Sequence, residues 1–324
     1  MNSNRLLSLF LLLLCCCLGV AHAQGAASSA SIQVADQDWN DGARQRVVPV
    51  RIRVPAGAGP YPVILFSHGL GGSRGAGTLW GEWWSQHGYL VIHLQHAGSD
   101  EALWKGRPLG AMARAREAMN AQNAALRTGD VGFVLDELER RRARGDALLA
   151  RADLQHIGLA GHSFGAQTTL AVAGERRAYG SGGADPRIRA AIAMSPSALG
   201  PESGLAQRYL DIRIPFMSMT GTEDKVALTP QVTPENRRLP YKYMPAPDKY
   251  LLVLAGANHM VYGGQPELRA WTEQNTREHA PRIEQVSLSF WDAYLKGDAT
   301  ARAALAADGP LRQSLGSGGE WFAK

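Results

Sequence analysis

The pentapeptide GHSFG, Gly161 to Gly165, is the feature that most limits how this chain can fold. The apolar run His156–Ala160 precedes it, and a helical pattern starts at Ala166. A serine between a strand and a helix lies on a sharp turn, and flanking glycines leave room for that turn. The helix N-terminus also favours the negative charge that develops there during nucleophilic attack. Ser163 is therefore the candidate catalytic nucleophile.

Strand patterns and helix patterns alternate from residue 62 to the end of the chain, which predicts an α/β fold. We expect a mostly parallel central sheet with helices on both faces. No linker is visible, so residues 45–324 are expected to form one catalytic domain after a leader at residues 24–44. Expected strands are Val47–Val54, Pro62–Phe66, Tyr89–Leu94, His156–Ala160, Ile188–Met194, Ile214–Met219 and Tyr250–Leu254; expected helices are Thr78–His87, Asn123–Arg142, one from Ala166 and a closing one at Val286–Leu295.

Composition excludes several classes of protein. The 324 residues are 45% hydrophobic and 19% charged, which is typical of a soluble globular chain and not of a disordered one. Lys and Arg number 34 against 29 Asp and Glu, so the net charge is only +5 and is spread along the chain. Such a weak, dispersed excess argues against a nucleic-acid partner.

The N-terminus has the pattern of a secretory signal peptide. Arg5 precedes the apolar run Leu6–Val20, and Ala21-His22-Ala23 forms a small-x-small cleavage site before Gln24. The run is too short to span a bilayer comfortably, and no later stretch is long enough. We therefore expect residues 1–23 to be removed after Ala23, and the mature chain to be secreted or periplasmic without stable membrane insertion.

All three cysteines, Cys15, Cys16 and Cys17, lie in this apolar run. A lipoprotein, in which one of them carries the lipid, is an alternative, but a small residue is expected before such a cysteine, and Leu or Cys stands there. The mature chain would contain no cysteine and could form no disulfide.

The candidate base and acid follow Ser163 in chain order, as a serine nucleophile in this fold class requires. His259 comes just after the strand that ends near Leu254 and is the candidate base. His279, in the polar segment 273–282, is the alternative and is expected to face solvent. Asp224 follows the strand Ile214–Met219 and is the candidate acid, with Glu223 as second choice.

An oxyanion hole needs two backbone N–H donors beside the nucleophile. Phe164, the residue after Ser163, is expected to supply one. The loop His68–Gly72 is expected to supply the other, at Leu70, with Gly69 and Gly71 as alternatives. His68 precedes Ser163 and is interpreted as a residue that shapes this loop.

Aromatic residues near that loop are candidates for a substrate pocket, with Trp80 and Trp104 the two selected. His93, His96 and Asp100 do not have the spacing of a recognised ligand set, so no metal and no cofactor are expected. Arg127 and Asp130 are expected to form a structural ion pair near a helix start.

Four strings occur together in order: HGLGGSR from His68, WWSQHGYLVIHLQHAGSD from Trp83, GHSFGA around Ser163, and DPRIRAAIAMSP from Asp185. In these the chain resembles an α/β-hydrolase of the dienelactone-hydrolase-like group, on the branch similar to platelet-activating-factor acetylhydrolases. The resemblance runs from about residue 45 to about residue 297. It implies the α/β-hydrolase fold and a serine esterase with nucleophile Ser163, acid Asp224, base His259 and an oxyanion donor near Leu70.

The expected function is hydrolysis of carboxylic esters through a Ser-Asp-His triad and an acyl-enzyme. The substrate would be a small-molecule ester, a lipid or a polyester. An amidase or peptidase with the same triad, a polyester hydrolase and a non-catalytic binding protein are the alternatives. Dienelactone hydrolases proper use a cysteine nucleophile, so turnover of dienelactones is not expected here.

Overall fold

The computed structural model describes residues 31–106, 109–177, 183–198, 200–265 and 269–324, although no side chain of residues 269–273 is described. The predicted signal peptide, its cleavage site, the three cysteines and the first residues of the leader lie outside this part of the chain. No helix within the described residues is long and apolar enough to cross a membrane.

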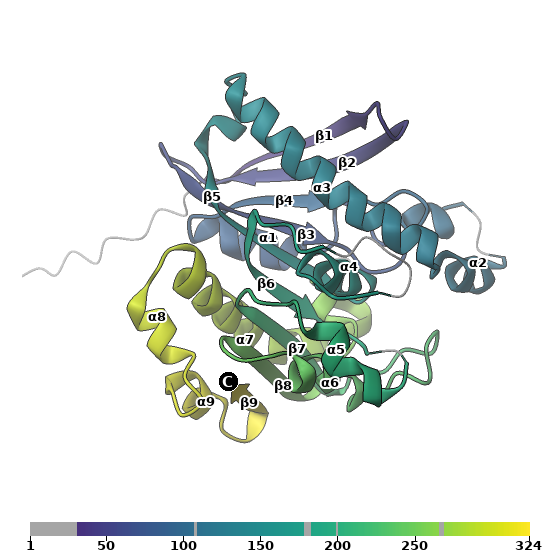
Figure 1. The fold of residues 1–324 in the computed structure, drawn as a ribbon, viewed down its shortest axis with the longest axis vertical. Helices are drawn as coiled ribbons and strands as arrows, with labels where there is room; N and C mark the ends of the chain where they lie inside the picture. The colour runs from purple at the N-terminus through teal and green to yellow at the C-terminus, as the bar shows by residue number, and fades with distance from the viewer. Residues whose placement is uncertain (1–30, 107–108, 178–182, 199, 266–268) are drawn as a thin grey trace, which may run out of the picture.

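A mixed sheet of nine strands forms the centre of the molecule, in the order β1-β2-β4-β3-β5-β6-β7-β8-β9 (Figure 1). The strands from β4 to β8 in this order run parallel, and the pairs β1–β2, β2–β4 and β8–β9 are antiparallel. The bounds are β1 Gln33–Asp41, β2 Arg46–Val54, β3 Tyr61–Ser67, β4 Leu90–Leu94, β5 Ala152–His162, β6 Ile188–Met194, β7 Phe216–Glu223, β8 Lys249–Asn258 and β9 Gly319–Ala323.

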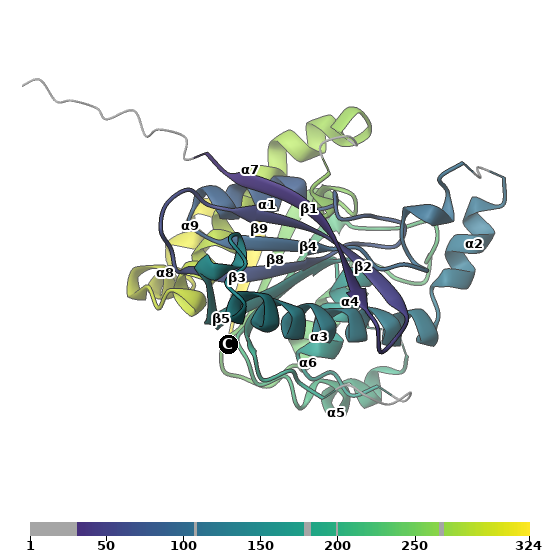
Figure 2. The same ribbon diagram turned by 90° about the horizontal axis from the view of Figure 1, so that it is seen from above.

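Helices cover both faces of this sheet, as Figure 2 shows from above. α1 and α7 lie on one face, and α3 to α6 lie on the other. The expected α/β architecture with a mostly parallel sheet is therefore confirmed. The helix bounds are α1 Thr78–Gln86, α2 Ala111–Ala118, α3 Ala121–Ala143, α4 Phe164–Val172, α5 Leu205–Tyr209, α6 Leu239–Tyr243, α7 Arg269–Leu295, α8 Ala299–Ala304 and α9 Pro310–Leu315.

The central strands form because nearly every residue in them is apolar and buried. In β3, Val63 and Leu65 pack toward α3, whereas Ile64 and Phe66 pack toward α1 and α7. A strand that is covered on both sides has no polar face, so it is a continuous apolar run in the sequence.

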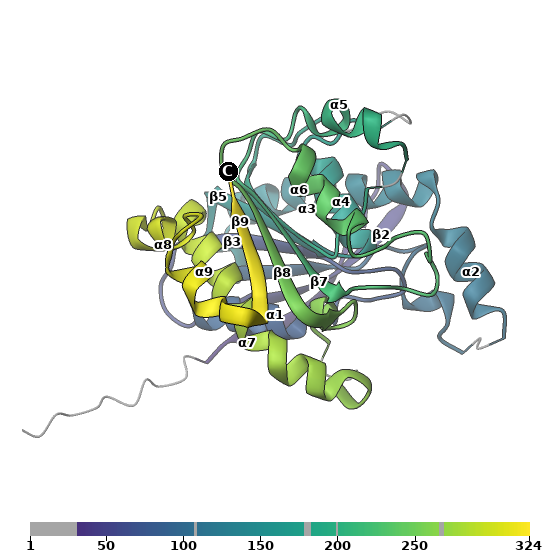
Figure 3. The same ribbon diagram turned by 90° about the horizontal axis from the view of Figure 1, so that it is seen from below.

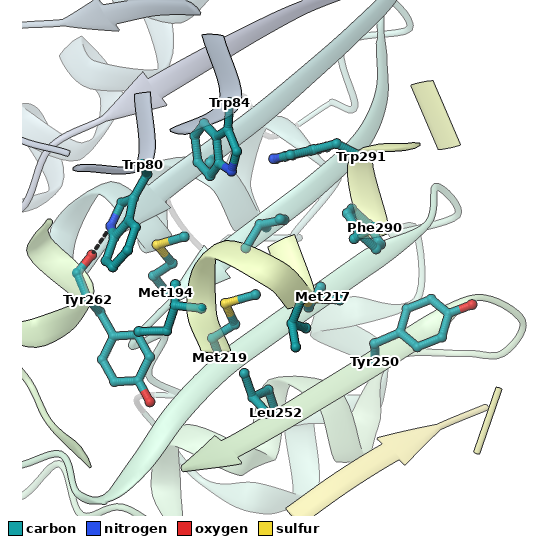
Figure 4. Close-up of a cluster of buried hydrophobic side chains, with 14 of the residues drawn as sticks. Trp80, Trp84, Met194, Met217, Met219, Tyr250, Leu252, Tyr262, Phe290 and Trp291 are labelled. Carbon is teal, nitrogen blue, oxygen red and sulfur yellow. Dashed lines mark hydrogen bonds between the residues drawn. The ribbon is translucent and has the colours of Figure 1, made fainter. Parts of the chain in front are cut away.

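Tryptophans fill the space between the sheet and the helices α1 and α7 (Figure 4). Trp84 meets Trp291 edge-to-face at a ring-centroid distance of 5.8 Å, and its Nε1–H donates to the Ser287 hydroxyl at 2.9 Å. A buried indole N–H needs such a partner, and the edge-to-face pair adds about 0.5–1.5 kcal/mol to the burial of its area.

Both outer strands of the sheet were missed in the sequence. The prediction of a leader at residues 24–44 is corrected for its second half. Gln33–Asp41 form β1 and pair with β2 along their whole length. β1 carries three aspartates, yet its Trp39 is fully buried. The chain also continues past the predicted closing helix into α8, α9 and β9 (Figure 3).

Candidate functional site

Ser163 lies at the junction of β5 and α4 with φ 55° and ψ −111°. Backbone of a non-glycine residue in such a sparsely populated region costs about 1–3 kcal/mol and persists only where the surroundings impose it. The neighbours here do so. A β-carbon on Gly161 would lie 2.3 Å from the Gly165 carbonyl oxygen, and one on Gly165 would lie 1.9 Å from the Ser67 carbonyl oxygen. Only glycines allow this turn to close against β3.

Asp224 and His259, predicted from chain order, are brought together by the adjacent strands β7 and β8. The His259 Nδ1–H donates to Asp224 Oδ1 at 2.7 Å, and the Thr220 hydroxyl donates to Asp224 Oδ2 at 2.9 Å. Both the carboxylate and the imidazole are buried. With the proton on Nδ1, the His259 Nε2 is free to accept a proton, which is the state a general base needs.

Arg237 is a residue of this site that the sequence did not reveal. It lies in the 3₁₀ turn Asn236–Arg238 and is only 3% exposed. Its Nε lies 2.9 Å from Asp224 Oδ1 and 2.9 Å from the Asp224 carbonyl oxygen, and Nη1 donates to the Ser195 carbonyl oxygen at 2.9 Å. One guanidinium therefore joins the acid to the end of β6. The polar stretch around it has no motif that would have singled it out.

Electrostatics keep the Asp224 carboxyl charged and the His259 imidazole neutral. Burial raises the pKa of the Asp224 carboxyl, but the hydrogen bond from His259 and the charge of Arg237 outweigh burial, so this pKa lies below its usual range. Burial lowers the pKa of His259 below its usual value, against the opposing effect of Asp224. A neutral imidazole beside a charged carboxylate is the resting pair of a serine hydrolase.

His162 holds the loop that carries His259 next to Ser163. Its Nε2–H donates to the His259 carbonyl oxygen at 3.0 Å, and the two rings lie 4.6 Å apart between centroids. No hydrogen bond between the Ser163 hydroxyl and the His259 ring is present among the described residues. Such bonds are often long or poorly aligned before substrate binds, and they tighten in the complex.

The two alternative residues occupy other places. The Glu223 side chain is 61% exposed and lies 3.7 Å from Lys225 Nζ. His279, expected to face solvent, is instead only 1% exposed, because α7 turns it toward the molecule. Neither of its ring nitrogens has a hydrogen-bond partner among the described residues, so no carboxylate supports it as a base.

The loop after β3 narrows the choice of the second oxyanion donor. The Gly71 N–H already donates to the Ser99 carbonyl oxygen at 2.7 Å. The Gly69 carbonyl oxygen accepts from the Gly72 N–H at 3.1 Å and from His68 Nδ1–H at 2.6 Å. In a trans peptide the Leu70 N–H points the opposite way from that carbonyl, out of the turn.

This loop also lies beside Ser163. A β-carbon on Gly69 would lie 3.4 Å from the Ser163 Cβ. His68 has the loop-shaping role predicted for it, because its Nε2 additionally accepts from the His96 N–H at 3.0 Å.

The two tryptophans selected for a pocket differ. Trp80 is fully buried, and its Nε1–H donates to the Tyr262 carbonyl oxygen at 3.0 Å (Figure 4). It is a core residue that joins α1 to the segment after His259, which corrects the prediction. Trp104 is 39% exposed and covers the α-carbon of Gly71, where a β-carbon would lie 1.5 Å from its ring.

The buried histidines near the loop have partners within the protein. His93 Nδ1–H donates to the Ala76 carbonyl oxygen, whereas His96 lies between Ser67 and Asp130. Within the described residues, no three His, Cys, Asp or Glu side chains are grouped as metal ligands would be. The predicted Arg127–Asp130 pair is also corrected: Asp130 pairs with Arg44, Arg46 and His96, and Arg127 donates elsewhere.

A comparison with protein families finds a match to the family model described as "Platelet-activating factor acetylhydrolase, isoform II", over residues 48–105. A comparison with curated proteins finds no match. The matched segment runs from β2 to the start of the long connection after β4, and includes the loop His68–Gly72 but none of Ser163, Asp224 and His259. Over residues 48–105 the predicted resemblance is confirmed: this part of the chain is similar to the platelet-activating factor acetylhydrolases of isoform II.

Proposed function

We propose that the chain is a serine hydrolase of the α/β-hydrolase fold that cleaves carboxylic esters. Ser163 is the nucleophile, His259 the base and Asp224 the acid. The observation that carries the proposal is the 2.7 Å hydrogen bond between Asp224 and His259, which follow the parallel strands β7 and β8 at the same end of the sheet as the strained turn of Ser163 after β5. The family matched at residues 48–105 is named for an acetylhydrolase, which supports an ester as substrate.

Each residue has one task in this mechanism. The Ser163 Oγ attacks the ester carbonyl carbon while His259 Nε2 takes the hydroxyl proton. The carbonyl oxygen becomes an oxyanion, stabilised by the Phe164 and Leu70 N–H groups. Collapse of this intermediate breaks the bond to the alcohol, which leaves with the proton from His259. Water then attacks the acyl-enzyme by the same route in reverse and releases the acid.

The test is hydrolysis of p-nitrophenyl esters from acetate to palmitate by purified residues 24–324. We expect Ser163→Ala to lower kcat on the order of 10⁶-fold, as in other serine triads. A variant that keeps more than a tenth of the activity would rule out Ser163 as nucleophile. Activity on matched anilides but not on esters would favour an amidase, and an intact fold with no activity on either would favour a binding protein.

We also propose that the chain is exported, with residues 1–23 removed after Ala23. The support is the charged start, the apolar run and the small-x-small site in the sequence. N-terminal sequencing of the protein recovered outside the cytoplasm should begin at Gln24. Recovery of the intact N-terminus in the cytoplasm, or of a lipid-modified cysteine, would contradict this.

A further inference from the structure

We infer that Arg127 is a positioning residue for the oxyanion hole, because its buried guanidinium joins the loop that carries one N–H donor to the helix that carries the other. This inference rests on the proposed function. Arg127 projects from α3, is fully buried, and belongs neither to the triad nor to the segment that matches a known family.

One side of the guanidinium contacts the helix that follows the nucleophile. Its Nε–H donates to the Thr168 hydroxyl at 3.0 Å, and its central carbon lies 4.7 Å from the centre of the Phe164 ring. Phe164 supplies the first proposed donor, and Thr168 lies one turn further along α4. The contact therefore fixes the start of α4 relative to α3.

The other side contacts the loop after β3. Nη2 donates to the His68 carbonyl oxygen and, at 3.1 Å, to the Ser67 hydroxyl, and Nη1 donates to the Ser99 hydroxyl at 2.8 Å. The Ser99 carbonyl oxygen in turn holds the Gly71 N–H. Arg127 thus fixes the entry to the loop directly and its next turn through Ser99.

These contacts decide where the second donor points. Holding the His68 carbonyl sets the plane of the His68–Gly69 peptide, and the next carbonyl, of Gly69, is held by His68 and Gly72. With two successive peptide planes fixed, the Leu70 N–H has one direction left. An oxyanion hole depends on such preorganisation, because its donors must already lie where the negative charge develops.

Within the described part of the chain, no carboxylate contacts the Arg127 cation directly, and a buried charge without such a partner is a costly way to fill space by packing alone. Asp130, one turn along α3, reaches it only indirectly: His96 links Asp130 to Ser67, and Ser67 accepts from Arg127. Burial lowers the pKa of Arg127 to about 9, so the guanidinium is still charged at neutral pH. Five donors in a rigid plane are what allow one side chain to hold four separate acceptors.

The test compares Arg127→Lys with Arg53→Lys. Arg53 is also a buried arginine, 2% exposed, but it contacts Thr78 and Glu82 of α1 and neither the loop nor α4. Lysine keeps the charge and loses the planar fork in both variants. The final extent of fluorophosphonate labelling measures the concentration of active sites in each variant. Each kcat is then expressed per labelled serine.

We expect Arg127→Lys to lower kcat per site about 10²-fold with less than a threefold change in KM, in line with loss of oxyanion stabilisation. Its affinity for an alkyl trifluoromethyl ketone, which forms a tetrahedral adduct, should fall in parallel with kcat/KM. Arg53→Lys should lower Tm but leave both quantities unchanged. Equal kcat per site in Arg127→Lys and wild type, or equal losses in both variants, would overturn the inference.

Two smaller changes decide the matter if Arg127→Lys does not fold. Thr168→Val and Ser99→Ala each remove one acceptor of the guanidinium, and each should lower kcat several-fold with KM unchanged. Unchanged kcat in both would overturn the inference. Ser163→Ala is measured beside them to tell the two hypotheses apart. If Ser163→Ala keeps its activity, the proposed function fails; if it is inactive while Thr168→Val and Ser99→Ala are unchanged, only the inference about Arg127 fails.

Discussion

At the level of single residues, the site is held by buried charges that each have several partners. Asp224 is contacted by His259, Arg237 and Thr220 through its two carboxylate oxygens. Removing one partner of such a group leaves the others without compensation, and this costs more than the lost bond itself. Substitutions at this group should therefore affect catalysis far more strongly than substitutions of its exposed neighbours.

Asp224→Asn should lower kcat about 10⁴-fold, because an amide no longer holds the His259 tautomer that accepts the serine proton. Glu223→Gln is the matched control, since the adjacent carboxylate is 61% exposed, and it should leave kcat within twofold. Both are measured on the ester on which the wild type is most active. Comparable losses in the two variants would remove Asp224 from the proposed triad.

The pH dependence of kcat/KM should report on His259. Its pKa lies below the usual value of about 6.5, so activity should persist as pH falls through 6.5 and decline only at lower pH. Arg237→Gln removes a positive charge that lowers this pKa, and should move the acid limb of the profile to higher pH.

The neighbouring Arg238, which pairs with Glu320 at 2.6 Å on the surface, provides the control Arg238→Gln, with an unchanged profile. If the acid limb shifts equally in both variants, or in neither, the charge of Arg237 does not specifically lower the pKa of His259.

At the level of elements, the close approach of α4 to β3 determines the shape of the turn at Ser163, between β5 and α4. Gly165→Ala places a methyl group 1.9 Å from the Ser67 carbonyl oxygen, so α4 must move away from the sheet. We expect loss of most esterase activity together with a lower Tm. The measurement is Tm and kcat per labelled serine.

Gly132→Ala is the opposite case, because apart from the local backbone of α3 no described atom lies within 4 Å of a β-carbon added there in the middle of the helix. It should raise the free energy of unfolding by about 0.5–1 kcal/mol through lower entropy of the unfolded chain, with kcat unchanged. A destabilised Gly132→Ala would show that α3 tolerates less than its open surroundings indicate.

Substitutions of Trp104 and Trp80 should likewise have different effects, one on substrate preference and the other on stability. Trp104→Ala removes an exposed ring that covers Gly71, and should change the ratio of acetate to longer-chain ester hydrolysis with little change in Tm. Trp80→Phe deletes a buried hydrogen bond to Tyr262 and should lower Tm at an unchanged chain-length profile. An unchanged profile in Trp104→Ala would remove this residue from the proposed pocket.

Elements stabilised by their own local sequence could be predicted, whereas elements that depend on residues distant in the sequence could not. Strands β3, β6 and β8 are nearly continuous apolar runs, so their own residues specify them. β1 and β9 are specified mainly by the partner strand: only three of the nine residues of β1 are apolar, and β9 has only five residues. Likewise Ser163, Asp224 and His259 follow strands in a known order, whereas Arg127 and Arg237 act through contacts 13 to 60 residues distant in sequence.

At the level of the whole molecule, the sheet extends further than the sequence indicated, and its first strand should be needed for stability. Trp39 of β1 is fully buried and lies under Arg141 of α3, 4.8 Å from ring centre to guanidinium. A chain that starts at residue 45 should have a lower Tm than residues 24–324 and aggregate more readily, because β2 becomes an open edge. Thermal unfolding and light scattering measure both, and equal Tm values would show that β1 is dispensable.

The other end of the sheet has a practical consequence for attaching the protein to a solid support. β9 runs antiparallel to β8, so Gly319 pairs with Leu254 near the His259 end of β8, and Ala323 pairs with Tyr250 at its far end. Lys324, at the C-terminus marked in Figure 3, exchanges hydrogen bonds with Lys249 at the start of β8. Ser163 follows the end of β5, which runs in the same direction as β8, so Lys324 and Ser163 lie at opposite ends of the strands. A linker added after Lys324 would hold the molecule with the Ser163 end of its strands facing the solution. That end would then be open to a substrate that is too large to diffuse.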